Sequence, residues 1–380
     1  MDGSVVFDPN AYASVRRPLA EAECLPPWCY TSQDFYEREV ERIFLRTWNF
    51  VGREEELPNP GDYQVFDFVG QSVIIVRDRA NKLHAFLNSC RHRGTRLLDG
   101  QGSCRAITCP YHAWAYSLSG QLVATPGMEN ILNFDKKDWG LTPVRLESWA
   151  GLVFINFSDD GPDLRAYLGN FIDTFESYRF EDMVLTRRLN YELNCNWKLY
   201  VENAMEDYHT PTVHRGSIGL QETIPEDSRG EWDAIHMEAA NTIAVLPGDT
   251  TPFPHIPTLK GKAATGAYFA LIYPAAFFGT TKDCMWFLQT IPLGPTKMML
   301  SVGSCFPKSI VARPDFSEVV QRYYKRWDKS IPEDNAISER QQAGLSTSLT
   351  RPGRLSLREP IVHSIANWVL DRVLDRRVAV

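Results

Sequence analysis

The sequence predicts an α+β protein in which a β-rich region precedes a region of mixed helices and strands. From about residue 49 to 157, short alternating apolar runs are separated by turn residues, which is typical of strands. Beyond this region, helical periodicity is mixed with longer strand-like runs. A hydrophobic content of 44% and a charged content of 23% over 380 residues are typical of a folded globular chain.

The first predicted element is an amphipathic helix over residues 32–48, because apolar side chains recur on one side of it. Thr31 or Ser32 would cap the start of this helix. An acidic, glycine-containing stretch at 158–163 predicts a domain boundary. The alternating runs between these points predict strands at 63–68, 72–76 and 152–156.

Beyond the boundary, helices are predicted at 164–178, 316–327 and 361–376, and strands at 268–276 and 285–306. A segment rich in Pro, Thr and Gly around His255, residues 249–262, predicts either a surface connection or a lid. One more helix is expected to begin around Pro332, which suits a first turn, and to end near Gly344.

Two mixed pairs of metal-binding side chains form the most informative motif. Cys90-x-His92 is followed after sixteen residues by Cys109-x2-His112. In a Rieske [2Fe–2S] cluster, two Cys hold one iron and two His hold the other. A structural zinc site is the alternative, but zinc motifs usually pair Cys with Cys and His with His. Cys104 fits neither pair and is predicted to be a small buried residue.

A second motif, Glu206-x2-His209-x4-His214, predicts a mononuclear iron site. Non-haem oxygenases bind Fe(II) with two His and one carboxylate on one face. A helix would bring Glu206 and His209 to one side, and Pro211 would break that helix so that His214 can return. The third ligand should be a carboxylate further along the chain. Two ordinary histidines near a helix end are the alternative.

The residues around both motifs resemble those of Rieske non-haem iron oxygenase large subunits, and this resemblance covers nearly the whole chain. The segments that carry it are 88–94, 109–114, 196–198, 202–214 and 353–363. It implies an N-terminal helical segment (1–48) that packs on the catalytic domain. It further implies an antiparallel Rieske domain (49–157) and a catalytic iron domain (158–380) with a curved antiparallel sheet and packed helices, similar to a helix-grip fold.

The resemblance also assigns roles to single residues. It implies that His209 and His214 bind the iron, and that an Asp at the start of a C-terminal helix, commonly after a Glu, is the third ligand. Asp334 fits that description, and Glu333 is the alternative. Cys90, His92, Cys109 and His112 would hold the cluster.

In this family the carboxylate at the position of Glu206 is not a ligand. It connects the Rieske histidine of a neighbouring subunit to an iron-binding histidine and carries the electron path, which implies a homotrimer. Many members have Asp there, and the Glu form resembles oxygenases of carnitine-like substrates. Asp207 competes with Glu206 for the role, but its spacing to His209 does not fit.

The function implied is that of a terminal oxygenase, which activates O2 at Fe(II) with electrons from the [2Fe–2S] cluster. Because the sequence has no recognisable NAD(P)H, flavin or phosphate-binding motif, a partner reductase or ferredoxin should supply the electrons. The chain length and Glu206 favour monohydroxylation or oxidative N-demethylation of a small organic substrate. Cis-dihydroxylation of an aromatic ring is the alternative; a non-catalytic Rieske electron carrier and a zinc-stabilised binding module are more remote ones. Rings that could line the pocket or pack in the core are Tyr268, Phe269, Tyr273, Phe277, Phe278 and Trp286.

Charge and composition exclude other classes of function. A net charge of −7 argues against nucleic acid or an anionic membrane surface as partner, and no apolar run approaches twenty residues. The first residues lack the basic and apolar regions of a signal peptide. Of eight cysteines, the six outside the cluster motif have no framework spacing, which predicts reduced thiols and a cytoplasmic location.

Overall fold

The computed structural model describes residues 3–249 and 253–374. The chain divides into two compact units. One comprises residues 48–164, and the other combines residues 1–47 with residues 165–380. The sequence-based boundaries lie after residues 48 and 157. Each unit is built around an antiparallel sheet, as the α+β prediction requires.

The unit of residues 48–164 contains a seven-stranded antiparallel sheet of order β1-β10-β9-β4-β3-β2-β5. Its strands are β1 (Asn49–Arg53), β2 (Asp62–Phe68), β3 (Gln71–Arg77), β4 (Leu83–Leu87), β5 (Gln101–Ser103), β9 (Pro143–Trp149) and β10 (Leu152–Asn156). Residues 73–76, Val-Ile-Ile-Val, are buried on both faces of β3, as suits a central strand of β-branched residues. The predicted strands at 63–68, 72–76 and 152–156 are confirmed.

A second, three-stranded sheet in this unit consists of β6 (Ile107–Thr108), β7 (Ala115–Tyr116) and β8 (Leu122–Ala124). Cys90 and His92 follow β4, whereas Cys109 and His112 lie in the connection between β6 and β7. Two short 3-10 helices, η4 (Glu54–Glu56) and η5 (Lys136–Trp139), complete the unit. Both metal-binding pairs therefore lie in loops that follow short strands.

The other unit contains a seven-stranded antiparallel sheet of order β11-β17-β16-β15-β14-β13-β12. Its strands are β11 (Met183–Leu193), β12 (Ile224–Pro225), β13 (Trp232–Glu238), β14 (Gly266–Ile272), β15 (Ala276–Thr280), β16 (Met285–Gly294) and β17 (Lys297–Pro307). The predicted strand region 285–306 is therefore a hairpin, because the chain reverses directly after Gly294.

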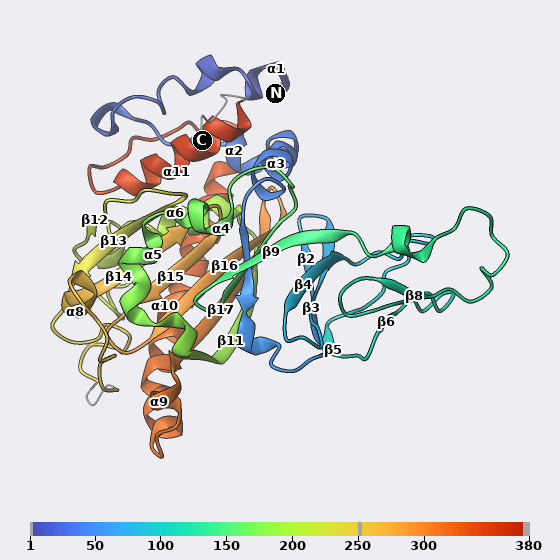
Figure 1. Cartoon of the computed structure of the whole chain (residues 1–380). Coiled ribbons are helices and arrows are strands. Elements are labelled where there is room, and N and C mark those ends of the chain that lie inside the picture. Colours follow the sequence, from blue (N-terminus) through green and yellow to red (C-terminus); the bar gives the residue numbers. More distant parts are fainter. Residues whose placement is uncertain (1–2, 250–252, 375–380) are drawn as a thin grey trace. The chain divides into compact units, whose positions relative to one another are not determined.

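Helices surround this sheet, as Figure 1 shows. The α-helices are α1 (Gly3–Val6), α2 (Trp28–Thr31), α3 (Gln33–Glu39), α4 (Leu164–Leu168, at the boundary of the two units), α5 (Phe171–Phe175), α6 (Trp197–Ala204), α7 (Thr210–Val213), α8 (Lys262–Thr265), α9 (Lys308–Val311), α10 (Phe316–Leu345) and α11 (Pro360–Val373). The 3-10 helices are η1 (Pro9–Tyr12), η2 (Leu19–Glu21), η6 (Glu176–Tyr178) and η7 (Phe180–Asp182), and η3 (Val40–Phe44) is a π-helix.

Several predicted helices occur with altered limits. The helix predicted at 32–48 consists of α3 and η3, and the Ser32 hydroxyl caps it by accepting the N–H of Phe35 at 3.3 Å. The helix predicted at 164–178 is interrupted at Gly169, whose φ of +52° does not fit a helix. Residues 375–376 of the last predicted helix, and 250–252 of the predicted loop, lie outside the described residues.

The helix α10 corrects the prediction that a helix begins at Pro332. The chain is continuously helical from Phe316 to Leu345, with Pro332 inside. A proline there removes one backbone N–H donor, which weakens a helix. Packing compensates, because Tyr323, Trp327 and Ile331 lie four residues apart and are all buried.

The segment between α6 and α7 also differs from its prediction. The helix α6 ends at Ala204, so Glu206 and His209 do not share a helical face. A turn brings them together instead, because a Glu206 carboxylate oxygen accepts the N–H of His209 at 3.1 Å. Pro211 lies in the first turn of α7, where its missing N–H costs little. It therefore begins a short helix rather than ending a longer one.

The N-terminal segment packs against the helices of the second unit. Lys198 of α6 donates to Glu39 of α3 at 2.7 Å, and both side chains are fully buried. His363 of α11 lies 3.0 Å from the carbonyl of Val15. Figure 1 shows this N-terminal segment in blue beside α11 in red. Among the described residues, no helix is long and apolar enough to cross a membrane.

Candidate metal centres

The cysteines and histidines of the first motif lie together in the unit of residues 48–164. Cys90 and Cys109 are buried, and the ring centroids of His92 and His112 are 4.8 Å apart. The Nδ1 atoms of both histidines are buried without a hydrogen-bond partner. Buried polar atoms are rarely left unpaired, so two such nitrogens beside two thiols fit a [2Fe–2S] cluster with Cys2His2 ligands.

Neighbouring side chains support these ligands in ways that the motif did not reveal. The Tyr116 hydroxyl accepts the N–H of Arg91 at 3.0 Å and lies 3.3 Å from the Cys90 sulfur. The indole of Trp114 stacks on His92 with centroids 4.8 Å apart. Cys104 is only partly buried and packs against the core of this unit, so the prediction that it is a buried residue is wrong.

The environment of Cys109 favours its thiolate form. Burial raises the pKa of this thiol, but hydrogen bonds from the backbone N–H groups of Tyr111 and His112, together with the Cys90 and Thr95 side chains, outweigh burial and hold the pKa below its ordinary value. Thiolates are the form in which cysteine binds metals. The Cys109 sulfur is therefore in an environment that suits a metal ligand.

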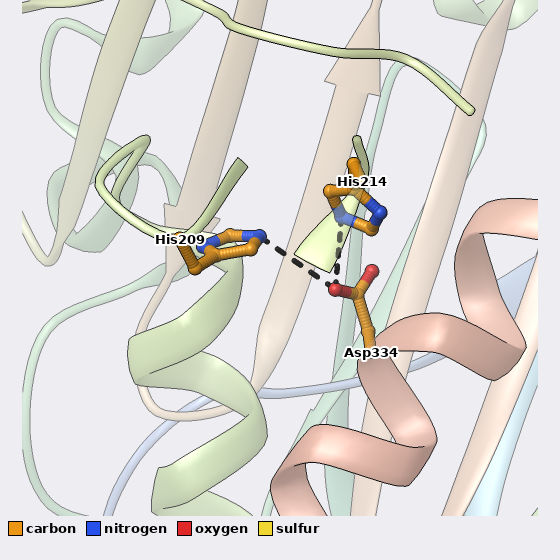
Figure 2. Close-up of side chains that lie close together, drawn as sticks. All are labelled: His209, His214 and Asp334. Carbon is orange, nitrogen blue, oxygen red and sulfur yellow. Dashed lines mark ion pairs between the residues drawn. The ribbon is translucent and has the colours of Figure 1, made fainter. Parts of the chain in front are cut away.

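In the other unit, His209, His214 and Asp334 converge from different elements (Figure 2). The Nε2 atoms of His209 and His214 lie 3.6 and 3.0 Å from Oδ1 of Asp334. One ligand atom from each residue lies within 4.8 Å of the other two. Two imidazoles and one carboxylate in this arrangement fit a mononuclear non-haem iron.

Two further carboxylates contact the Nδ1 atoms of these histidines, the ring nitrogens that do not face Asp334. Oε1 of Glu206 lies 2.6 Å from Nδ1 of His209, and Oε2 of Glu333 lies 2.8 Å from Nδ1 of His214. Such contacts fix which nitrogen points at a metal. Glu333, the alternative third ligand in the sequence, thus contacts the nitrogen of His214 that faces away from Asp334.

The electrostatics of this cluster favour a cation. Burial lowers the pKa of His214, but the neighbouring carboxylates Asp334 and Glu333 outweigh burial and raise the pKa above its ordinary value. The same carboxylates would stabilise a divalent metal in place of that proton. Asp207, the sequence competitor of Glu206, instead contacts Arg358 at 2.7 and 3.0 Å.

A pocket opens beside these residues. Its polar wall includes Glu206, His209, His214 and Asp334, and its apolar wall includes Ile235, Phe269, Phe277, Trp286 and Leu288. Of the six candidate rings, Phe269, Phe277 and Trp286 therefore line the pocket. Among the others, Tyr273 stacks on Trp368 at 4.5 Å and Phe278 contacts Phe171, both as core packing.

One pocket residue, Arg326, was not predicted from the sequence. It precedes Asp334 by eight residues on α10, so both lie on one face of that helix. The predicted break before Pro332 hid this relation, because it separated the two residues into different helices.

A Cys2His2 arrangement in one antiparallel unit and a two-His, one-carboxylate arrangement in the other define an iron protein of the Rieske class. The Rieske [2Fe-2S] domain model matches residues 47–136, and the model for the ring hydroxylating alpha subunit (catalytic domain) matches residues 180–375. The chain belongs to this family of ring-hydroxylating alpha subunits.

Among its relatives, the carnitine monooxygenase oxygenase subunit of Escherichia coli (strain K12) is 40% identical over 219 residues. That match covers 57% of this chain and 57% of the relative, so the chain matches little more than half of that protein. The biphenyl 2,3-dioxygenase subunit alpha of Rhodococcus jostii (strain RHA1) is 36% identical over 217 residues, which cover 53% of this chain and 45% of the relative.

A solved structure is similar over a longer stretch. The quaternary ammonium Rieske monooxygenase CntA in complex with gamma-butyrobetaine is 26% identical, with a TM-score of 0.77. The match covers 93% of this chain and 95% of that one. The fold of both units thus occurs together in a known Rieske monooxygenase.

Proposed function

We propose that this chain is the terminal oxygenase component of a Rieske oxygenase system, which oxidises a small organic substrate with O2. Cys90, His92, Cys109 and His112 would hold a [2Fe–2S] cluster, and His209, His214 and Asp334 a mononuclear Fe(II). When bound, the cluster supplies single electrons and the iron supplies the site of O2 activation. One observation carries the proposal: three ligand atoms lie within 4.8 Å of one another at the wall of a pocket.

The surrounding residues would keep this site in working geometry. Glu206 and Glu333 accept the Nδ1–H protons of His209 and His214, which leaves both Nε2 lone pairs free for a metal. The apolar wall of the pocket would exclude water from the side on which a substrate binds. Two histidines and one carboxylate would hold the iron on one face, a ligand set that suits O2 chemistry when the metal is bound.

Electrons would enter through the cluster from a partner reductase or ferredoxin. We propose that Glu206 carries them onward to His209 and that the chain works as a homotrimer, with cluster and iron paired across subunits. The contact of 2.6 Å between Glu206 and His209 supports this role.

The reaction that we propose is monohydroxylation or oxidative N-demethylation. The similarity to proteins named carnitine monooxygenase and quaternary ammonium monooxygenase supports it. Ring cis-dihydroxylation is the second candidate, because the biphenyl dioxygenase relative is almost as similar and three aromatic rings line the pocket. Formaldehyde as a product would indicate demethylation, and a dihydrodiol would indicate dihydroxylation.

The first test separates the two proposed metal centres. We expect the purified chain to show the EPR signal of a reduced Rieske cluster and, after addition of nitric oxide, the signal of a mononuclear iron nitrosyl. His209→Ala should lose only the nitrosyl signal. His255→Ala, a control at an exposed histidine, should keep both. A nitrosyl signal that survives in His209→Ala would contradict the proposed iron site.

A further inference from the structure

Arg326 is a buried cation at the wall of the pocket. Only 4% of its surface is exposed, and it lines the pocket together with Ser330 and Asp334. These three residues follow one another at intervals of four on α10, so they form one row along the helix. The row places a positive charge and a proposed iron ligand on the same wall.

The guanidinium of Arg326 makes one hydrogen bond and one ring contact. Its Nε donates to the carbonyl of Ile243 at 2.8 Å. Its Cζ lies 5.0 Å from the ring centroid of Trp286. In the described part of the chain, its Nη1 and Nη2 atoms make no hydrogen bond or ion pair with a protein group.

The positive charge of Arg326 persists at neutral pH. Burial lowers the pKa of this side chain, but only to about 10. A buried charge without a partner is costly, so proteins usually pair it. Two guanidinium nitrogens without a protein partner, on a residue that lines a pocket, therefore suit the binding of an anion.

The carboxylates nearest to the pocket are committed elsewhere. Asp207 is paired with Arg358, Glu206 is held against His209, and Asp334 faces both histidines. Asp334 attracts Arg326 electrostatically, but no hydrogen bond or ion pair joins the two side chains. Among the described residues that line the pocket, none is hydrogen-bonded or ion-paired to Arg326 through its side chain.

We propose that Arg326 binds the carboxylate of the substrate, so that this oxygenase acts on organic monocarboxylates whose opposite end is oxidised at the iron. This inference rests on the proposed oxygenase function. Guanidinium and carboxylate match in geometry, because two parallel N–H groups meet two oxygens. Eight residues of α-helix, about 12 Å along the axis, separate Arg326 from Asp334, so anchoring and oxidation occur at different positions.

The same geometry argues against a substrate that carries only a cation. Trp286 lies over Gly279, where even a Cβ would come within 2.2 Å of the indole. Arg326 then covers the indole as a cation from the protein itself. A quaternary ammonium group would compete with this guanidinium for the ring and be repelled by its charge. A trimethylammonium compound fits only if it also has a carboxylate.

The test uses the iron-loaded full chain and matched probes that differ in one carboxylate. The pairs are glycine betaine with choline, and 3-phenylpropionate with 3-phenylpropanol, with acetate as the smallest anion. Binding is measured by calorimetry and by the change that each probe causes in the iron nitrosyl EPR signal. We expect the carboxylate of at least one pair to bind about 10- to 100-fold more tightly than its partner.

Variants then assign that preference to Arg326. Arg326→Gln should remove the preference, and Arg326→Lys should restore part of it, because an ammonium keeps the charge without the paired donors. Lys325→Gln is the matched control: it removes one positive charge from the next residue, whose side chain is 65% exposed. This control should bind the probes as the unmodified chain does. Thermal unfolding and cluster absorption verify that each variant is folded.

The results of these binding measurements either support or overturn the role of Arg326. A carboxylate preference that disappears in Arg326→Gln and persists in Lys325→Gln supports the proposal. No selective response to any carboxylate in the unmodified chain, or an undiminished preference in Arg326→Gln, overturns it. If the unmodified chain gives no nitrosyl signal at all, the proposed oxygenase function fails instead.

Discussion

The two proposed metal centres present their histidines in opposite ways. At the first, His92 and His112 have buried Nδ1 atoms without partners. At the second, Glu206 and Glu333 occupy the Nδ1 atoms of His209 and His214, while the Nε2 atoms face Asp334. In each histidine, the ring nitrogen that can bind a metal is the one that no neighbouring side chain occupies.

This difference reflects how each centre is assembled. The first is built from two loops about twenty residues apart, each of which contributes one Cys and one His. The second needs α10 to bring Asp334 and Glu333 to histidines that lie about 120 residues earlier. Local loop geometry thus decides the first centre, and the packing of distant elements decides the second.

The largest effect is expected when the ligands of one centre alone are removed. Cys109→Ala should abolish the visible absorption of the cluster, because it removes one of the two proposed thiolate ligands, while the iron nitrosyl signal remains. Cys104→Ala, at a cysteine between the two loops, should keep the colour. Loss of both signals in Cys109→Ala would show that the centres do not assemble independently.

The next test separates a ligand from the carboxylate that orients one. Asp334→Ala should lose the mononuclear iron, measured as metal content and nitrosyl signal. Glu333→Gln keeps an acceptor for Nδ1 of His214 and should bind iron only about 10- to 100-fold more weakly. If Glu333→Gln lost the iron and Asp334→Ala retained it, the two roles would be reversed.

A third test compares two adjacent carboxylates. Glu206→Gln should keep both metals but lose nearly all turnover, because the proposed electron path passes through this carboxylate to His209. Asp207→Asn, which weakens the contact to Arg358, should instead cost about 1–3 kcal/mol of stability. Reoxidation of the cluster by O2 in the presence of substrate measures the first effect, and undiminished turnover would remove Glu206 from the path.

The smallest expected effect concerns the helix that leads into the iron-binding turn. Burial raises the pKa of Glu202 on α6 to about 7, above its ordinary value. The folded chain therefore holds this proton more tightly than the unfolded chain, and stability falls as pH rises from about 4.5 to about 7. Glu202→Gln should unfold like the unmodified chain at pH 5 and be more stable by up to about 3 kcal/mol at pH 8. Equal stability at both pH values would contradict this.

The sequence predicts most of what is local in this molecule. The cluster residues, the strands around them and the pair His209 and His214 follow from spacing and alternation within a few residues. The fold class follows from the same patterns. Short-range periodicity is sufficient here because each of these features depends on neighbours in the chain.

The remainder depends on packing between distant residues. Pro332 predicted a helix start, but buried side chains of α10 carry the helix through it. Glu206 and His209 are joined by a turn rather than by a helical face. The pairing of Glu333 with His214 and the position of Arg326 in the pocket depend on how α10 lies against the sheet, which no local pattern encodes.

The row of residues along α10 implies that substrate choice and metal binding can change separately. Asp334 is the proposed iron ligand, whereas the side chains at 326 and 330 line the pocket without a proposed role in metal binding. Substitutions at these two positions would give related enzymes new substrates without moving the iron. Insertion of a single residue between them and Asp334 would instead turn Arg326 by about 100° away from the pocket. Among relatives, the number of residues between positions 326 and 334 should therefore vary far less than the residue types at positions 326 and 330.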